Sequence, residues 1–318
     1  MIMFRSPVFP LLALSLLPLL SARGNPGGTD LEVLRNRLVA SLLPREPLEK
    51  KTLFRKARRA LGSLRKDGTW RDVDYASRNR SAWRAARHLY RCLLLARAAR
   101  LSGSREYARA ALVSLRFWLN KDPRNPNWWW NQIGVPRRIG ETALLLQKRL
   151  EPEDTKKVLE ILRRSRWKGW TGQNLVWGVT IQVLRGLLEG SARTAARAFR
   201  RMYQEIRIVD PSREGIQADM SFHQHGRVLY SGGYGAGFTA DAGRFLSFAR
   251  GTAFAAPREK TDLLLSYVLD GQRWMIRGAY WDYGVMGREI SREGRNALGI
   301  LPGLKALEPL AGKRLPEL

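Results

Sequence analysis

Apolar residues recur at three- and four-residue spacing along most of this 318-residue chain. In the stretch that Ser104 opens, Ala108, Leu112, Leu115 and Leu119 fall on one side of a helix, and arginines fall on the other side. Strand-like alternation of apolar and polar residues is scarce. The pattern predicts an all-α fold, because a period near 3.6 residues belongs to amphipathic helices.

About ten helices of roughly 12 to 20 residues fit the spacing. We expect them over residues 31–42, 48–64, 81–101, 104–119, 138–150, 153–164, 174–188, 192–206, 240–252 and 260–278. Thr29 or Asp30 is expected to cap the first helix, after a spacer over residues 24–28. The inward stripe of the third is predicted to be Trp83, Ala86, Tyr90, Leu93 and Ala96. Helices of this number fit hairpins stacked in a ring or arc better than a four-helix bundle.

The first 23 residues have the layout of a secretory signal peptide. Arg5 precedes an apolar run from Val8 to Leu20, and the small pair Ser21-Ala22 follows. The run contains two prolines and is shorter than the ~20 apolar residues of a membrane-spanning helix. We therefore expect a secreted or periplasmic protein with no membrane segment after signal removal, with a signal anchor as the alternative. No linker follows residue 29, so residues 24–318 are expected to form one domain.

Cysteine and histidine are scarce. Cys92 is the single cysteine and lies in an apolar helical context, which indicates a core residue. The histidines His88, His223 and His225 do not form a His-Glu-x-x-His spacing. We therefore expect no metal site and no cofactor.

The chain carries a strong excess of positive charge. Its 56 Lys and Arg outnumber its 28 Asp and Glu, which gives a net charge of +28 spread along the sequence. A positive field of this size favours a polyanionic partner. Export favours an acidic polysaccharide over nucleic acid, and no helix-turn-helix, zinc or RNA-binding signature is present. The alternative interpretation is that part of the excess, about a third, only covers solvated faces.

Three consecutive tryptophans, Trp128, Trp129 and Trp130, stand between Asn127 and Asn131. Neighbouring residues on a helix point in different directions, so all three cannot enter one core. At least one is expected to face a cleft or solvent, where an aromatic ring can stack on a sugar. The alternative is a tryptophan-rich structural corner.

Two further segments carry groups suited to catalysis. His225 and Tyr234 lie in a glycine-rich stretch whose small residues would let a bulky polymer approach the backbone. Arg288 and Arg292 are four residues apart, so on a helix they would share one face. Two guanidinium groups there would grip a carboxylate or sulfate and lower the pKa of a neighbouring phenol. A structural histidine and a solvated basic face paired with nearby glutamates are the alternatives.

Together these segments resemble polysaccharide lyase family 8, the family of hyaluronate, chondroitin AC and xanthan lyases. The matching stretches, in the family's order, are NWW at 127–129 with IGVPR at 133–137, TGQN at 171–174, DMSFHQHG at 219–226 with YG at 234–235, and RGAYWD at 277–282 with GREISR at 287–292. The resemblance implies an incomplete (α/α) toroid of helical hairpins, here expected without the C-terminal β-sandwich domains usual in the family. Met220 stands where the family usually has glycine.

The resemblance also implies roles for individual residues. Tyr234 would transfer the proton, Asn174 and His225 would engage the uronate carboxylate, and Arg288 and Arg292 would assist. The implied substrate-binding residues are Asn127, Trp128 and Trp129.

The implied reaction is β-elimination in a uronic-acid polysaccharide such as chondroitin or hyaluronan, catalysed by a monomer. Elimination requires that hydrogen bonds neutralise the carboxylate and that a base remove the proton on C5. It needs no attacking water, which agrees with the absence of a clear pair of glycosidase carboxylates. The alternatives are a single-domain lyase of the alginate type, a polysaccharide-binding protein without catalysis, and a basic nucleic-acid binder.

Overall fold

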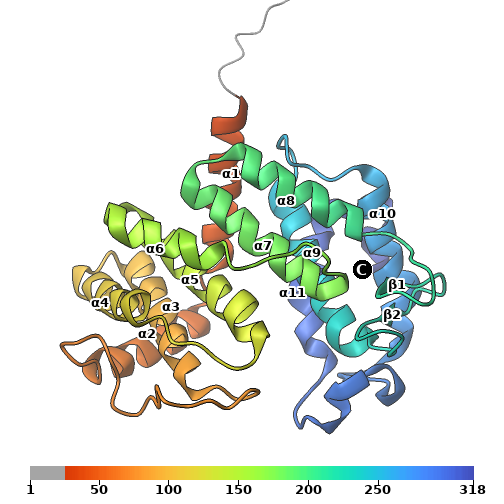
Figure 1. Ribbon diagram of the computed structural model, residues 1–318. Coiled ribbons are helices and arrows are strands. Elements are labelled where there is room, and N and C mark those ends of the chain that lie inside the picture. The colour runs from red at the N-terminus through yellow and green to blue at the C-terminus, as the bar shows by residue number, and fades with distance from the viewer. Residues whose placement is uncertain (1–25) are drawn as a thin grey trace, which may run out of the picture.

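The computed structural model describes residues 26–318, so the predicted signal peptide over residues 1–23 lies outside the described part (Figure 1). Eleven α-helices dominate this part of the chain. They are α1 Pro26–Ser41, α2 Pro47–Gly62, α3 Arg87–Ser102, α4 Arg105–Lys121, α5 Val135–Leu146, α6 Pro152–Leu162, α7 Gly172–Glu189, α8 Ala192–Glu205, α9 Ala236–Ala249, α10 Arg258–Ser266 and α11 Leu301–Leu307. The all-α prediction is confirmed.

The strands within residues 26–318 form two short antiparallel ladders, and three isolated β-bridges accompany them. The strands are β1 Gly215–Ile216, β2 Phe222–His223, β3 Ile276–Arg277 and β4 Tyr280–Trp281. Ile216 pairs with Phe222 in the first ladder, and Ile276 pairs with Trp281 in the second. Each ladder lies in a segment that carries predicted site residues.

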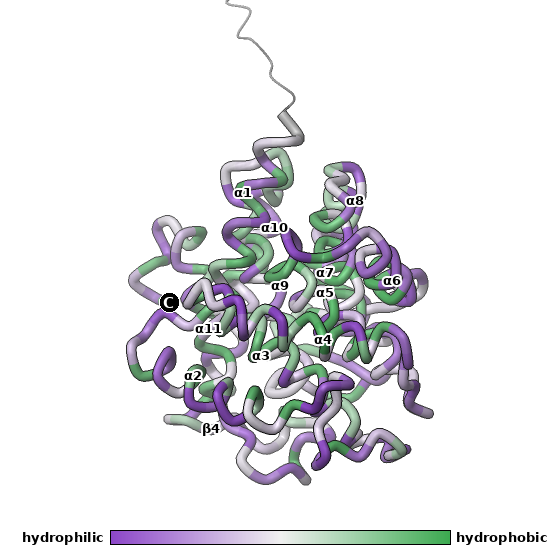
Figure 2. Tube along the Cα trace, turned by 90° about the vertical axis from the view of Figure 1, so that its left-hand side faces the viewer, coloured by the Kyte–Doolittle hydropathy of each residue, from purple (hydrophilic) through white to green (hydrophobic). Residues whose placement is uncertain are grey.

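The helices form stacked hairpins. The helices α3, α5, α7 and α9 contact one another in turn and make an inner row, while α4, α6 and α8 each pack against the inner helix that precedes them. The inner helices are the more hydrophobic part of the trace (Figure 2). Gly186 allows a close approach of α7 and α8, since a Cβ there would lie 2.8 Å from the backbone N of Ala195 in α8. This arrangement is the predicted incomplete toroid.

Several local expectations hold. Ser104 caps α4 by accepting a hydrogen bond from the Tyr107 amide at 3.3 Å. Cys92 is fully buried in the core, as predicted. None of the helices in residues 26–318 is long and apolar enough to cross a membrane.

The predicted inward stripe of the third helix is wrong at Tyr90, which is 49% exposed. The helix begins only at Arg87, after a 3-10 turn, so the expected register with Trp83 does not continue into it. Leu89 and Cys92 set the buried face instead. The exposed ring of Tyr90 is covered by Arg138, whose guanidinium carbon lies 5.0 Å from the ring centroid.

Helix ends also differ from expectation. The first helix begins at Pro26, so the predicted spacer over residues 24–28 enters it and Thr29 and Asp30 lie inside the helix. The carboxylate of Asp30 accepts from the Ala253 amide, which ties α1 to the loop after α9. The helix expected over residues 260–278 ends at Ser266 and continues as a π-helical turn and a 3-10 turn.

Wide π-helical turns occur at Trp130–Gly134 and Ser231–Gly235. The first runs directly into α5 and the second directly into α9. A π turn holds one residue more than the α-helical turn it replaces, and such turns are frequent at functional sites. Both turns contain residues that line one cavity.

Candidate active site

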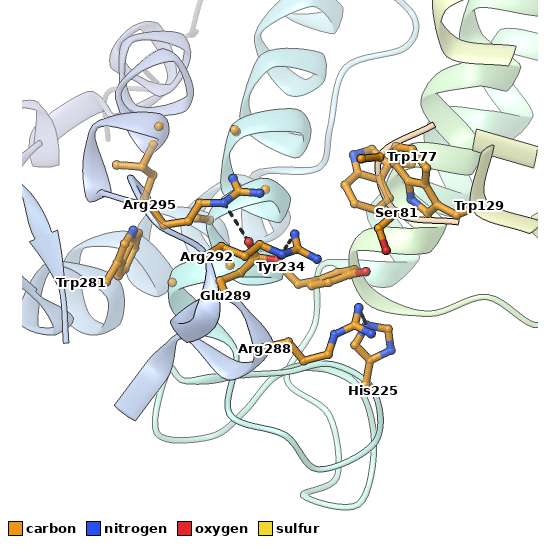
Figure 3. A pocket seen from close by; sticks show the side chains of 18 of the residues that line it. Ser81, Trp129, Trp177, His225, Tyr234, Trp281, Arg288, Glu289, Arg292 and Arg295 are labelled. Atoms are coloured by element: carbon orange, nitrogen blue, oxygen red, sulfur yellow. Dashed lines mark hydrogen bonds and ion pairs between the residues drawn. The ribbon is translucent and has the colours of Figure 1, made fainter. Parts of the chain in front are cut away.

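A cavity of about 870 Å³ lies between the two halves of the described chain. One wall consists of tryptophans together with the loop at Ser81, and the opposite wall comes from residues 281–300 (Figure 3). Tyr234 and His225 lie between these walls. Of the predicted residues, the cavity is lined by Asn127, Trp128, Trp129, His225, Tyr234, Arg288 and Arg292.

The tryptophan wall is built by contacts between rings. Trp129 meets Trp177 edge to face with ring centroids 5.6 Å apart, and Trp177 lies 5.6 Å from Tyr234. Trp128 is 43% exposed and packs beside Trp170 at 5.3 Å. The prediction that at least one of the consecutive tryptophans faces a cleft or solvent is confirmed. An exposed indole at a cavity wall can stack on the apolar face of a ring-shaped ligand.

His225, Tyr234 and Arg288 form one cluster. The His225 and Tyr234 rings meet edge to face with centroids 4.9 Å apart. The Arg288 guanidinium lies 2.9 Å from the His225 imidazole and also interacts with the Tyr234 hydroxyl. An imidazole, a phenol and a cation from three separate segments therefore meet at one point of the cavity.

The contact with Arg288 fixes the protonation of His225. A guanidinium can only donate, so Nε2 of His225 accepts its hydrogen bond and the ring proton resides on Nδ1. Burial and the Arg288 charge lower the pKa of His225 below its ordinary value, which favours this neutral form. His225 is thus a hydrogen-bond donor through Nδ1.

The pKa of Tyr234 differs from expectation. Burial raises the pKa of the Tyr234 phenol above its ordinary value, and the Glu289 carboxylate adds to the rise. Arg288 and Arg292 act in the predicted direction and lower it, but burial outweighs them. The phenol is therefore protonated near neutral pH, although both arginines lower its pKa as predicted.

Arg288 and Arg292 do not share a helix face. Residues Gly287–Ser291 form a 3-10 turn, and Arg292 has extended backbone angles. Arg292 instead pairs with the buried Glu289 carboxylate at 2.7 Å, and Arg295 pairs with the same carboxylate at 2.8 Å. Glu289 holds both arginines at the cavity wall, while Arg288 remains directed at His225.

Tyr230 supports the cluster of His225, Tyr234 and Arg288. It is fully buried, and its hydroxyl donates to Glu289 at 3.1 Å. Its ring occupies the space that two glycines leave, since a Cβ on Gly233 or Gly287 would lie within 2.3 Å or 2.6 Å of ring atoms. The glycine-rich turn therefore accommodates Tyr230, in addition to lining the cavity.

Asn174 lies in the first turn of α7, on the same side as Trp177 one turn later. It is absent from the cavity lining, although its Oδ1 is buried without a hydrogen-bond partner among the described residues. The helix start is anchored next to it. Gln173 and Trp177 both donate to the buried Asp241 carboxylate, at 2.8 Å and 2.9 Å, and Arg137 pairs with it.

The His225 loop is held by Glu214. This carboxylate accepts from the Gly226 amide at 3.0 Å, from the Thr171 hydroxyl at 2.6 Å and from the Gln224 side chain. Gln224 is fully buried and accepts from the first turn of α7. His225 itself has a left-handed φ of 60°, a strained conformation that these bonds maintain.

Met220 keeps the turn for which the family resemblance implies glycine. Its φ is 61°, the left-handed region that glycine favours. The turn is closed by a hydrogen bond from the Met220 amide to the Gln217 carbonyl at 3.0 Å. The chain therefore reaches β2 and His225 along the expected path.

A sequence profile described as polysaccharide lyase family 8, N-terminal alpha-helical domain, matches residues 49–304. The chain belongs to polysaccharide lyase family 8. The chondroitinase-AC of Pedobacter heparinus is similar to this family 8 chain at 28% identity over 269 residues, 82% of this chain and 38% of the relative. The xanthan lyase of Bacillus sp. is 25% identical over 70% of this chain and 26% of that protein.

The fold comparison agrees. A chondroitinase AC lyase structure, from work on enzyme-oligosaccharide complexes, superposes with a TM-score of 0.84 at 26% identity, over 91% of this chain and 43% of that chain. The Paenibacillus xanthan lyase has the same helical fold, with a TM-score of 0.78 at 18% identity and coverage of 90% and 30%. This family 8 chain spans about two fifths of the length of the chondroitinase. It spans a smaller share of the length of the xanthan lyase.

Sequence reasoning did not single out four groups that shape the site. Trp177 reads as an ordinary position of α7, and Tyr230 reads as part of the glycine-rich run. Glu214 and Glu289 read as solvated carboxylates among arginines. One feature of the sequence could have indicated Glu214 and Glu289. Few carboxylates lie near these segments, so each carboxylate is a candidate acceptor for several donors.

Proposed function

We propose that this family 8 chain cleaves a uronic-acid polysaccharide of the chondroitin or hyaluronan kind by β-elimination. The observation that carries the proposal is the contact of His225, Tyr234 and Arg288 at the floor of a cation-rich cavity. The relatives in sequence include proteins named chondroitinase-AC and hyaluronate lyase. We further propose that residues 24–318 form a single exported domain that acts as a monomer.

Recognition of the uronate is assigned to His225 and Asn174. Because Nε2 of His225 accepts from Arg288, the ring proton is on Nδ1, which has no acceptor within residues 26–318 and can donate to a carboxylate. The amide of Asn174 supplies a second donor from the first turn of α7. Hydrogen bonds to the carboxylate stabilise the enediolate that develops when C5 loses its proton.

Proton transfer is assigned to Tyr234. His225 is poorly suited as the base, since its acceptor nitrogen already receives the Arg288 hydrogen bond. The phenolate of Tyr234, favoured by Arg288 against the effect of burial, takes the proton from C5. The C5–H electrons form the C4=C5 double bond, the C4–O bond breaks, and the phenol returns the proton to the departing oxygen. No water is consumed.

The tryptophans and Asn127 would hold the neighbouring sugars. Trp128 offers an exposed indole, and Trp129 lines the cavity beside Trp177. The side chain of Asn127 is held in place, because its amide donates to the backbone carbonyl of Arg80 at 3.0 Å. Ring stacking of this kind favours polymeric substrates over single uronates.

Purified protein incubated with chondroitin, chondroitin sulfates or hyaluronan should develop the ultraviolet absorbance of the C4=C5 double bond. Tyr234→Phe should lower the rate by about 10²- to 10⁴-fold while binding persists, as expected for loss of an acid–base group. Equal rates for wild type and Tyr234→Phe, or no absorbance with any uronan, would refute the proposal. Binding without turnover in both proteins would instead indicate a carbohydrate-binding role.

A further inference from the structure

The solvent-facing side of α2 carries a row of cations that have no carboxylate partner. Lys51, Arg55 and Arg59 follow one another at four-residue spacing, and Arg58 lies beside them on the same face. All four side chains are exposed, and none forms a hydrogen bond or an ion pair within residues 26–318. We call these four residues the basic stripe. Successive cations of the row are roughly 6 Å apart along the helix axis, because four residues separate them.

The charge of the basic stripe is not offset by the helix that carries it. The one carboxylate within α2 is Glu49, which stands two residues before Lys51 and therefore does not face it. By contrast, Arg116 on the adjacent helix α4 pairs with Asp154 at 2.8 Å. The basic stripe is thus a concentrated positive face, and a face of this kind attracts a polyanion.

The apolar side of α2 is already covered by protein. Leu53 and Ala57 are buried and cluster with Ala98 of α3. An amphipathic helix binds a bilayer by inserting its apolar side, and α2 has no such side exposed. No residue of α2 lines the cavity that contains Tyr234. The basic stripe therefore fits a water-soluble polyanion that lies outside this cavity.

We propose that the basic stripe is a binding surface, separate from the cavity, for an acidic polysaccharide that carries sulfate as well as carboxylate in its repeating unit. Such a polymer presents anions more densely than hyaluronan, whose repeating unit has a carboxylate alone, so it can contact several cations of the row at once. Exposed ionic contacts are individually weak, but contacts made by one chain act together. A polymer held on α2 keeps its other segments near the cavity. The choice of a polysaccharide rests on the proposed function.

Binding should be measured by isothermal titration in the Tyr234→Phe background, so that no polymer is consumed. The test variant replaces three cations of the basic stripe: Lys51→Gln, Arg55→Gln and Arg59→Gln. The matched control removes the same charge from exposed cations on separate elements outside the cavity: Arg193→Gln, Arg277→Gln and Lys313→Gln. The test variant should bind long chondroitin sulfate chains about tenfold more weakly, the scale of three exposed ionic contacts. The control should bind these chains nearly as well as the parent protein.

The choice of ligand separates the basic stripe from the cavity. Hyaluronan chains should lose less affinity than chondroitin sulfate chains, and a chondroitin sulfate tetrasaccharide, too short to reach both surfaces, should bind the parent and both variants equally. Unchanged binding of long chains by the test variant, an equal loss in the control, or a loss that extends to the tetrasaccharide would overturn the inference.

Two further outcomes concern the identity of the polymer. Binding of duplex DNA that depends on the basic stripe and exceeds the binding of chondroitin sulfate would also overturn the inference, because it would assign the surface to nucleic acid. Binding of chondroitin sulfate that depends on the basic stripe, in a protein whose wild type shows no measurable elimination, would reject the proposed function and leave this inference intact.

Discussion

Nη2 of Arg288 lies 2.9 Å from Nε2 of His225, and this contact assigns complementary tasks to the two residues. The imidazole becomes a donor through Nδ1, and the guanidinium remains close enough to act on the Tyr234 phenol. Arg288 thus controls both a hydrogen-bond donor for the carboxylate and the acidity of the proposed base.

Arg288→Gln should shift the rising limb of the pH–rate profile to higher pH. Arg288 lowers the pKa of Tyr234 against the effect of burial, so its removal raises that pKa further and the phenolate forms only in more alkaline solution. The measurement is kcat/KM for elimination between neutral and alkaline pH. Arg277→Gln, at an exposed arginine of β3, is the control and should leave the profile unchanged. Superimposable profiles for the two variants would argue against Arg288 as the tuning group.

Glu214→Gln should lower kcat by about tenfold with little change in KM. The substitution replaces a carboxylate that accepts from Gly226, Thr171 and Gln224, and charge-assisted bonds of this kind contribute roughly 1.5–3 kcal/mol each. Relaxation of the left-handed His225 would displace its ring from Arg288. Asp219→Asn, which alters a carboxylate in the same loop, should affect kcat much less. Steady-state kinetics on one polymer would test this, and an unchanged kcat would exclude Glu214 as a positioning residue.

Trp128→Ala should raise KM several-fold and leave kcat nearly unchanged. The exposed indole is proposed to stack on a sugar remote from the reacting bond, and such contacts contribute about 0.5–1.5 kcal/mol. The control is Trp274→Ala, which removes a tryptophan that is 75% exposed but does not line the cavity. If the two substitutions had the same effect on KM, the tryptophan wall would not be a sugar subsite.

Acid should destabilise the fold partly through His88. Burial lowers the pKa of His88 from 6.5 to about 4, and the neutral ring donates to the Ser114 carbonyl while accepting from Tyr75. Below pH 6.5 the His88 imidazole is protonated in the unfolded chain but still neutral in the folded chain. Its contribution to the free energy of unfolding is therefore fully present above pH 6.5 and decreases as the pH falls towards 4. The full loss is roughly 3 kcal/mol.

The test for His88 is the free energy of urea unfolding at several pH values. Carboxylates contribute to the same decline, so the decisive quantity is the difference in slope between wild type and His88→Gln, which should be flatter. If the variant does not fold, an NMR titration of the wild-type imidazole answers the same question. A ring that protonates near pH 6.5 in the folded protein would contradict the expectation.

Helix periodicity predicted stacked helical hairpins, and the resemblance of the ordered segments to family 8 implied the toroid and a shared site for His225, Tyr234 and Arg288. The pairing of Arg292 with a nearby glutamate was only the alternative to a shared face of Arg288 and Arg292. It holds here because a four-residue spacing implies a common face only where the backbone is α-helical. The position of Glu214 was hidden, since its partners lie up to 43 residues away in sequence. The net pKa of Tyr234 depends on burial, which residue types alone do not reveal.

The wide turn at Ser231–Gly235 allows the position of Tyr234 to change independently of the helices around it. An additional residue in one turn projects Tyr234 into the cavity while α9 continues in regular register towards the core. Deleting one residue there would restore the shorter repeat and rotate position 234 away from Arg288. A one-residue deletion in this turn would therefore move the phenol without changing the residues that form α9.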